Sequence, residues 1–227
     1  EAPTGTNTVF VAVADCTGHG VPGAMVSLVG TRALNSSVRE NQLTNTAEIL
    51  DRTNKIVLES FTDAESGTII KDGMDIGLCA LTTNNTKVDF QFSGAQNPIW
   101  IIRPIDSPNL IINAQELLPN IEHNGYKLFE IKGDKQPIGY FENQFPFNSY
   151  KGEFEKGDRF YLISDGFADQ FGGPNGKKFK YKALKKLILE QQHQSMPQQR
   201  ISLERAFYNW KGDLEQLDDV CLMGVEV

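Results

Sequence analysis

The sequence predicts an α+β fold in which two mostly antiparallel β-sheets form layers and helices pack against them in pairs. Runs rich in β-branched and aromatic residues, bounded by Gly, Asn, Pro or Asp, recur along the chain and are typical of strands. The helical patterns occur as two tandem pairs, and this grouping favours antiparallel pairing over alternating β-α units. A chain of 227 residues can bury a core without disulfides, so we expect a single domain over residues 1–227.

Local patterns place the individual elements. Strands are expected at 8–14, 75–83, 87–93, 98–103, 127–132, 145–154, 159–164 and 219–227. Pro22 suits the first turn of a helix over residues 21–34. Asn45, followed three residues later by Glu48, resembles a helix start and predicts a helix over 46–61. The second pair of helices is expected at 181–192 and 198–211.

Composition excludes several classes of function. The formal charge is −7 and no basic cluster accompanies it, which argues against binding to nucleic acid. No apolar run approaches the roughly 18 to 20 residues that cross a bilayer, so no membrane contact is expected from this domain. The three cysteines, Cys16, Cys79 and Cys221, are odd in number and widely spaced, which suits a reducing compartment. We therefore expect a cytoplasmic protein.

The stretch DCTGHGVPGAMVS at 15–27 raises two alternatives. Gly18, Gly20 and Gly23 match a dinucleotide-binding loop between a strand and a helix. Such a unit needs a second strand soon after the helix, ending in an acidic residue that binds the ribose. The corresponding region, NSSVRENQLTNTAE at 35–48, contains no strand, which disfavours a dinucleotide site. The alternative is that Asp15, at the end of the first strand, holds a metal ion.

Aspartates stand at the ends of three apolar strands. Asp15 ends TVFVAVAD, Asp165 ends DRFYLISD, and Asp218 and Asp219 begin DDVCLMGVEV. In antiparallel neighbours these ends meet, so we expect three or four carboxylates at one edge of the core. Such a concentration of negative charge requires compensating cations, and oxygen ligands suit Mg²⁺ or Mn²⁺ better than zinc. The competing interpretation is that each aspartate is an ordinary turn residue.

Two other phosphate chemistries do not match the sequence. A cysteine phosphatase needs an arginine after five intervening residues, and from Cys16 that position is Pro22. A P-loop needs Gly-Lys-Ser/Thr at a fixed spacing from an earlier glycine, and GGPNGKK at 172–178 lacks both the spacing and the last residue. Water activated by metal ions remains as the nucleophile.

The segments VAVADCTGHGVPGAMVS, YLISDGFAD and LDDVCLMGV follow one another in that order along the chain. As a set they resemble the PPM family of metal-dependent serine/threonine protein phosphatases, specifically its bacterial SpoIIE/RsbU branch. MDIGLCAL, FSGAQNPIWII and KQPIGYF also resemble family elements. The resemblance implies a four-layer α-β-β-α sandwich with two Mn²⁺ or Mg²⁺ ions at one end. It also implies that a water bridging the ions attacks the phosphorus of a phosphoserine or phosphothreonine.

The resemblance further implies a role for each acidic residue. Asp15 would bridge both metals, and the backbone carbonyl of Cys16 would bind one of them. Asp165 and Asp218 would complete the acidic shell, with Asp219 as a substitute ligand. Asp15, Asp165 and Asp218 are therefore the expected catalytic residues.

The sequence departs from the family pattern at three places. Family members carry a further aspartate in a Gly-Gly-Asp-aromatic strand upstream of Asp15, and nothing in EAPTGTNT matches it. We expect a fragment that lacks this N-terminal strand, binds its metals weakly, and forms the C-terminal output domain of a longer protein. The eukaryotic branch places a general-acid histidine where this chain has Thr17, which leaves the role of His19 open. Gln96 stands where many bacterial members have histidine.

Two functions remain open from the sequence. The first is a phosphatase output domain that acts on a phosphorylated protein under the control of a sensor domain. In the SpoIIE/RsbU branch the substrates are typically phosphorylated anti-sigma-factor antagonists, and regulation enters through the helices expected at 21–34 and 46–61. The second is a catalytically silent regulatory module with the same fold. A homodimer is compatible with both.

Overall fold

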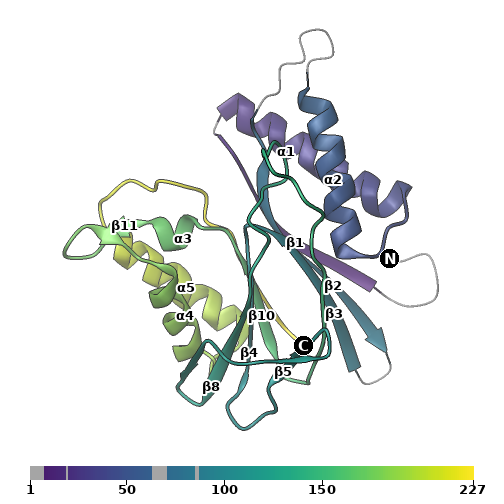
Figure 1. The fold of residues 1–227 in the computed structure, drawn as a ribbon. Coiled ribbons are helices and arrows are strands. Elements are labelled where there is room, and N and C mark those ends of the chain that lie inside the picture. The colour runs from purple at the N-terminus through teal and green to yellow at the C-terminus, as the bar shows by residue number, and fades with distance from the viewer. Residues whose placement is uncertain (1–7, 19, 63–70, 85–86) are drawn as a thin grey trace.

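Two antiparallel sheets face each other, and a pair of helices covers the outer face of each (Figure 1). This computed structural model describes residues 8–18, 20–62, 71–84 and 87–227. The expected four-layer α-β-β-α sandwich is therefore confirmed.

The first sheet has the strand order β1-β2-β3-β9. Its strands are β1 (Thr8–Cys16), β2 (Met74–Asn84), β3 (Lys87–Ala95) and β9 (Tyr150–Phe154). The second sheet has the order β13-β10-β4-β8-β7. Its strands are β4 (Ile99–Pro104), β7 (Ile121–His123), β8 (Tyr126–Ile131), β10 (Arg159–Ile163) and β13 (Leu222–Glu226). Every neighbouring pair within these two sheets is antiparallel.

The helices lie where the sequence patterns expected them. The first pair, α1 (Gly20–Asn35) and α2 (Thr46–Phe61), is joined through a short π-helix, η1 (Ser36–Glu40), and covers the first sheet. The Asn45 side chain accepts hydrogen bonds from the first backbone N–H groups of α2, as its cap position predicts. The second pair, α4 (Tyr181–Glu190) and α5 (Met196–Lys211), covers the second sheet.

Several short elements lie outside the sequence predictions. They are the hairpin β5 (Leu110–Ile112) and β6 (Gln115–Leu117), strand β7, the four-residue helix α3 (Gly166–Asp169), and the hairpin β11 (Phe171–Gly172) and β12 (Lys177–Lys178). The strand expected at 145–154 is confirmed only over β9. Side chains of helix α2 and of the preceding loop satisfy the backbone before it: Phe147 N–H donates to Asp51, and Asn148 N–H donates to Asp134.

Strand alternation divides the buried residues into layers. On β2, Cys79 faces the core between the sheets, while Ile76 and Leu78 face α1 and α2. On β4, Ile101 faces the same central core, while Trp100 packs under α4 and α5. Because side chains alternate along a strand, this parity also fixes the direction of the residues at the strand ends.

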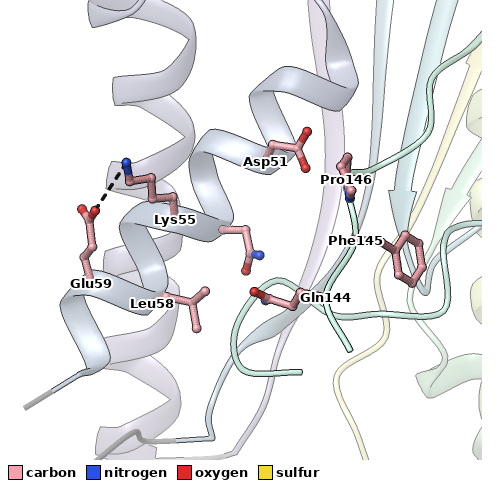
Figure 2. A pocket seen from close by; sticks show the side chains of 8 residues that line it. Asp51, Lys55, Leu58, Glu59, Gln144, Phe145 and Pro146 are labelled. Atoms are coloured by element: carbon pink, nitrogen blue, oxygen red, sulfur yellow. Dashed lines mark ion pairs between the residues drawn. The ribbon is translucent and has the colours of Figure 1, made fainter. Parts of the chain in front are cut away.

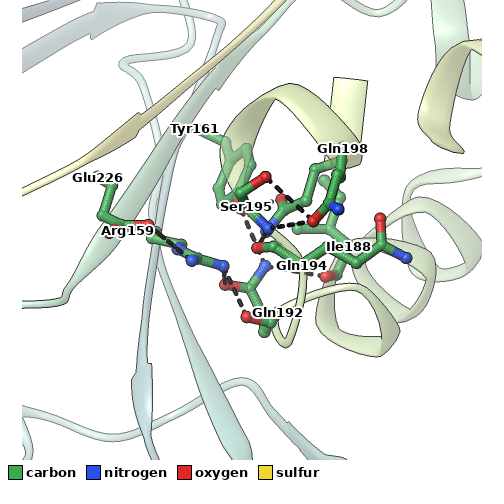
Figure 3. A network of polar contacts seen from close by, with 9 residues as sticks. Arg159, Tyr161, Ile188, Gln192, Gln194, Ser195, Gln198 and Glu226 are labelled. Atoms are coloured by element: carbon green, nitrogen blue, oxygen red, sulfur yellow. Dashed lines mark hydrogen bonds and ion pairs between the residues drawn. The ribbon is translucent and has the colours of Figure 1, made fainter. Parts of the chain in front are cut away.

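Buried polar contacts fasten α4 and α5 to the second sheet (Figure 3). Tyr161 of β10 donates its hydroxyl proton to Gln199 and accepts a hydrogen bond from Gln192. Arg159 donates to the Gln192 carbonyl at 2.7 Å and pairs with Glu226 at 2.6 Å. A capping box formed by Ser195 and Gln198 begins α5. The second helix pair is thus fixed relative to β10.

No helix in the described part of the chain is long and apolar enough to cross a membrane.

A buried ion pair in the second sheet can be removed by substitution to measure its contribution to the stability of the domain. Arg103 of β4 and Asp158 are 3% and 1% exposed, and their nearest nitrogen and oxygen atoms are 2.6 Å apart. Burial raises the pKa of Asp158, and the hydrogen bonds from Arg103 oppose that rise. We expect Asp158→Asn to lower the free energy of unfolding by about 3–5 kcal/mol, because it leaves the Arg103 charge buried without a partner. Urea unfolding measures this.

The matched control is Glu59→Gln, which breaks the pair with Lys55 on the surface of α2. Exposed pairs of this kind contribute about 0–1 kcal/mol, so the control should change stability little. Equal effects of the two substitutions would contradict a stabilising role for the buried pair.

Candidate metal centre

The acidic residues predicted from the sequence come together at one end of the sandwich. One carboxylate oxygen each of Asp15, Asp165 and Asp218 lie within 4.8 Å of one another. The expectation that the strands carrying them are neighbours is only partly correct. Asp165 and Asp218 flank the neighbours β10 and β13, but Asp15 ends β1 in the other sheet. The three carboxylates therefore meet across the sandwich, because β1 and β10 face each other and end at the same edge.

Because side chains alternate along β1, the Asp15 side chain points into the space between the two sheets. Val13, two residues earlier on β1, belongs to the central core, so Asp15 continues the same face. Cys16 points to the opposite face and packs with the residues under α1 and α2. A single-residue shift in the pairing of β1 would remove the carboxylate from the centre.

A glycine-rich loop connects Asp15 to helix α1. Gly18 and Gly20 both have positive φ, at 84° and 67°, a backbone conformation that glycine adopts without strain. A Cβ on Gly23 would lie 2.6 Å from the Gly18 carbonyl oxygen, so the loop folds closely onto the start of the helix. Thr17 attaches the loop to the first sheet, because Gly73 N–H donates to its hydroxyl and Thr17 N–H donates to the Gly73 carbonyl. His19 lies outside the described residues.

Buried side chains hold the segment that carries Asp218 and Asp219. The Ser164 hydroxyl donates to the Asp219 carbonyl at 3.1 Å and accepts from Cys221 N–H at 2.9 Å. A Cβ on Gly166 would lie 2.4 Å from the Asp219 carbonyl oxygen, so glycine permits this close approach. The strand expected at 219–227 begins only at Leu222. The Cys221 carbonyl still accepts a hydrogen bond from Ser164 N–H, but the Cys221 N–H and the Asp219 carbonyl bind the Ser164 hydroxyl instead of backbone groups.

Gln170, which is fully buried, holds the same segment from the other side. Its amide donates to the Glu215 carbonyl at 2.9 Å, and its side-chain oxygen accepts from Leu217 N–H. Its own backbone carbonyl accepts a hydrogen bond from the Trp210 indole at 3.0 Å. The position of Asp218 is therefore determined by contacts on both sides of it.

A cavity of about 720 Å³ opens beside the carboxylates. Its lining includes Asp15, Cys16, Asp218 and Asp219 together with the first turns of α1. Asp219 lies outside the group of three close carboxylates, although it lines this cavity. All five predicted site residues are thus at one end of the sandwich.

Like charges dominate the electrostatics of the site. Burial, and then the charges of Asp218, Asp165, Asp75 and Asp219, raise the pKa of Asp15 to about 6. Burial and the Asp218 charge likewise raise the pKa of Asp165. Lys178 opposes this rise, but its ammonium group already pairs with Asp169 at 2.8 Å. The centre therefore carries more negative charge than nearby side chains compensate.

The donor set fits divalent cations. One oxygen of Asp165, Oδ1, is buried and has no hydrogen-bond partner among the described residues. An unsatisfied carboxylate oxygen in this position is costly unless a cation binds it. Closely spaced carboxylates without histidine or thiolate ligands favour Mg²⁺ or Mn²⁺.

Sequence reasoning missed Asp75. This residue lies on β2 directly opposite Asp15, and it is half-buried. Burial and the charge of Asp165 raise its pKa to about 6. The segment MDIGLCAL predicts a strand that contains Asp75, but the prediction of a strand does not reveal which residue Asp75 faces on the neighbouring strand.

A second hollow, of about 390 Å³, lies between α2 and the loop at 144–146 (Figure 2). Asp51, Asn54, Lys55, Leu58 and Glu59 line it from the helix. None of the predicted site residues lines it. The Asn54 side chain accepts a hydrogen bond from Gly139 N–H, so this polar group fastens the loop to α2.

Comparisons with known proteins identify the family and the fold of the chain. The family model described as Stage II sporulation protein E (SpoIIE) matches residues 5–227. The comparison with curated proteins found no match. Among solved structures, the SiaA-PP2C domain of Pseudomonas aeruginosa superposes with a TM-score of 0.73 at 22% identity. That alignment covers 98% of this chain and 79% of the other.

Two further structures share the fold at lower identity. The RsbU and RsbW domains of Rv1364c from Mycobacterium tuberculosis give a TM-score of 0.65 at 16% identity, covering 97% of this chain and 52% of that one. The PP2C phosphatase domain of SpoIIE from Bacillus subtilis, solved with a fragment of its regulatory domain, gives 0.63 at 14% identity, covering 96% and 54%. Since the family model spans nearly the whole sequence, the chain belongs to the SpoIIE family of PPM-type phosphatase domains.

Proposed function

We propose that this domain hydrolyses phosphoserine or phosphothreonine on a regulatory protein with the help of two divalent cations, Mg²⁺ or Mn²⁺. The observation that carries the proposal is the approach of Asp15, Asp165 and Asp218 to within 4.8 Å. Asp15 and Asp165 would hold the cations from the two sheets, Asp218 from the segment before β13, and Asp219 or the Cys16 carbonyl would add a ligand. When bound, paired cations supply a nucleophilic water at neutral pH and neutralise phosphate charge.

The residues around the carboxylates keep this arrangement in place before substrate arrives. Ser164 and Gln170 fix the segment of Asp218, and Thr17 fixes the loop after Asp15. Preorganised groups avoid the cost of reorganisation during the reaction. The half-buried position of Asp15 and Asp165 reduces their contact with bulk water.

A covalent phosphoenzyme on cysteine is disfavoured by the local electrostatics. Cys16 and Cys221 both line the cavity. Burial and the Asp15 charge raise the pKa of each thiol, which keeps both protonated at neutral pH. A protonated thiol is a poor nucleophile, so direct attack by water is the simpler route.

The family and the exposed surface of α1 support a proposal for the partners. We infer that the natural substrate is a phosphorylated protein of the anti-sigma-factor-antagonist type and that this domain is the cytoplasmic output of a longer protein. Val21, Met25 and Leu28 are 74%, 57% and 72% exposed on one face of α1, whose first turns line the cavity. Such an apolar stripe supports contact with a regulatory domain or a second copy at this helix.

The proposed chemistry predicts the effect of removing one carboxylate. Asp165→Asn should lower Mn²⁺-dependent hydrolysis of a phosphoserine peptide by about a hundredfold or more, because several kcal/mol of transition-state stabilisation depend on the cations. The control is Asp106→Asn, an equal change in net charge at an exposed position after β4.

Steady-state rates with and without Mn²⁺ provide the measurement. Equal and measurable Mn²⁺-dependent rates for Asp165→Asn and the unaltered chain would overturn the assignment of the site. If the unaltered chain binds Mn²⁺ but hydrolyses no phosphopeptide, the domain acts as a catalytically silent regulatory module instead.

Charge crowding also predicts the pH dependence of stability in the metal-free protein. The pKa of Asp15 is about 6 in the folded protein, against an ordinary value of 3.8. The folded protein therefore binds the proton of this carboxyl group more tightly than the unfolded chain does. As pH rises from about 4 to about 6, the free energy of unfolding should fall relative to that of Asp15→Asn, and the deficit should persist at higher pH. Urea unfolding after removal of divalent cations measures the difference, and a difference that does not vary with pH would refute the prediction.

A further inference from the structure

The pairing of β1 with β2 places a fourth carboxylate beside the centre. Asp75 is the direct partner of Asp15 in this antiparallel pair. Side chains of directly opposed residues project from the same face, with Cβ atoms about 4.5–5.5 Å apart. Asp75 therefore stands next to Asp15 in space, although sixty positions of sequence separate them.

The same face of β2 looks toward the second sheet. Cys79, four residues after Asp75, lies in the central core. Gly77, two residues after it, lies so close to β10 that an added Cβ would be 3.2 Å from Leu162. Because residues at i, i+2 and i+4 share a face, Asp75 points toward the end of β10, where Asp165 follows.

The acidic residues form a row with two ends. Asp218 and Asp219 precede β13 at one end, and Asp15 and Asp165 occupy the middle. Asp75 lies at the other end, because β2 packs toward β4: a Cβ on Gly77 would be 3.6 Å from the carbonyl oxygen of Pro98, just before β4, whereas β13 lies on the opposite side of β10. Its carboxylate stands beside the three that lie within 4.8 Å of one another and is not one of them. In the described part of the chain, no hydrogen bond to the Asp75 carboxylate is found.

We propose that Asp75 is a metal-ligating residue of this centre and holds one of the two cations together with Asp15 and Asp165, on the side away from Asp218. The proposal rests on the proposed function, because it assumes that divalent cations occupy the site. Under this proposal, the second ion has a carboxylate ligand from β2 of the first sheet. The buried Asp165 Oδ1, which lacks a partner among the described residues, is available to such an ion.

The experiment is a calorimetric titration of the purified chain with Mn²⁺, compared among the unaltered protein, Asp75→Asn and Asp106→Asn. The unaltered protein and Asp106→Asn should bind two ions. Asp75→Asn should lose one binding event or bind that ion more weakly by at least about 10–100-fold, the loss found when groups that only support a ligand are removed. Its thermal midpoint without metal should equal or exceed that of the unaltered chain, because one repelling charge is gone, and its rise on adding Mn²⁺ should shrink.

A second variant tests direct contact and does not depend on how Asp75→Asn folds. Asp75→Cys places a soft sulfur ligand at the same position, so it should weaken Mn²⁺ binding and strengthen Cd²⁺ binding relative to the unaltered chain. If Asp75→Asn binds two Mn²⁺ ions with unchanged affinity, or Asp75→Cys gains no affinity for Cd²⁺, Asp75 is not a ligand while the proposed function stands. If the unaltered chain binds no Mn²⁺, the proposed function fails and this proposal fails with it.

Discussion

The carboxylates of Asp15, Asp165 and Asp218 repel one another at the end of the sandwich, yet the backbone holds them within 4.8 Å. Hydrogen bonds and core packing around these carboxylates maintain that arrangement. Hydrogen bonds from Thr17, Ser164 and Gln170 attach each acidic segment to a buried strand or helix. The core between the sheets supplies the rest, because the packing of β1 against β10 prevents Asp15 and Asp165 from separating.

A centre assembled from both sheets couples cation binding to the stability of the whole domain. Neither sheet carries all of the acidic residues: the first contributes Asp15 and Asp75, and the second contributes Asp165 and the segment of Asp218. Any ion that binds the folded site but not the unfolded chain shifts the equilibrium toward the fold. The same ion also removes the electrostatic penalty of the crowded carboxylates. Under the proposed function, we therefore expect the domain to be more stable when cations occupy the site.

Much of the fold could be predicted from local patterns, and the reasons for the exceptions are physical. The helix at 46–61 has its cap at Asn45 and an apolar stripe, and both signals are local. The three-residue strands β5, β6 and β7 carry too few residues for a pattern and depend on their partners. Residues 145–149 have the composition of a strand, but Pro146 lacks an N–H, and side chains of Asp51 and Asp134 bind the backbone beside it.

The residues that lie together at this end of the sandwich were predictable as a set but not as an arrangement. Strand ends identified Asp15, Asp165, Asp218 and Asp219, and family resemblance added Cys16. The meeting of these ends across two sheets depends on how the sheets stack, which no local pattern encodes. Asp75 was missed for a related reason, since its importance appears only once the register of β1 and β2 places it opposite Asp15.

The contact between Trp210 and Gln170 has a spectroscopic consequence. The indole of Trp210 donates to the backbone of Gln170, whose side chain holds the residues immediately before Asp218. The chain has two tryptophans, and the other, Trp100, is fully buried under α4 and α5. We therefore expect the fluorescence of Trp210 to respond when the Asp218 segment is displaced, which would make this tryptophan an intrinsic optical reporter of that movement.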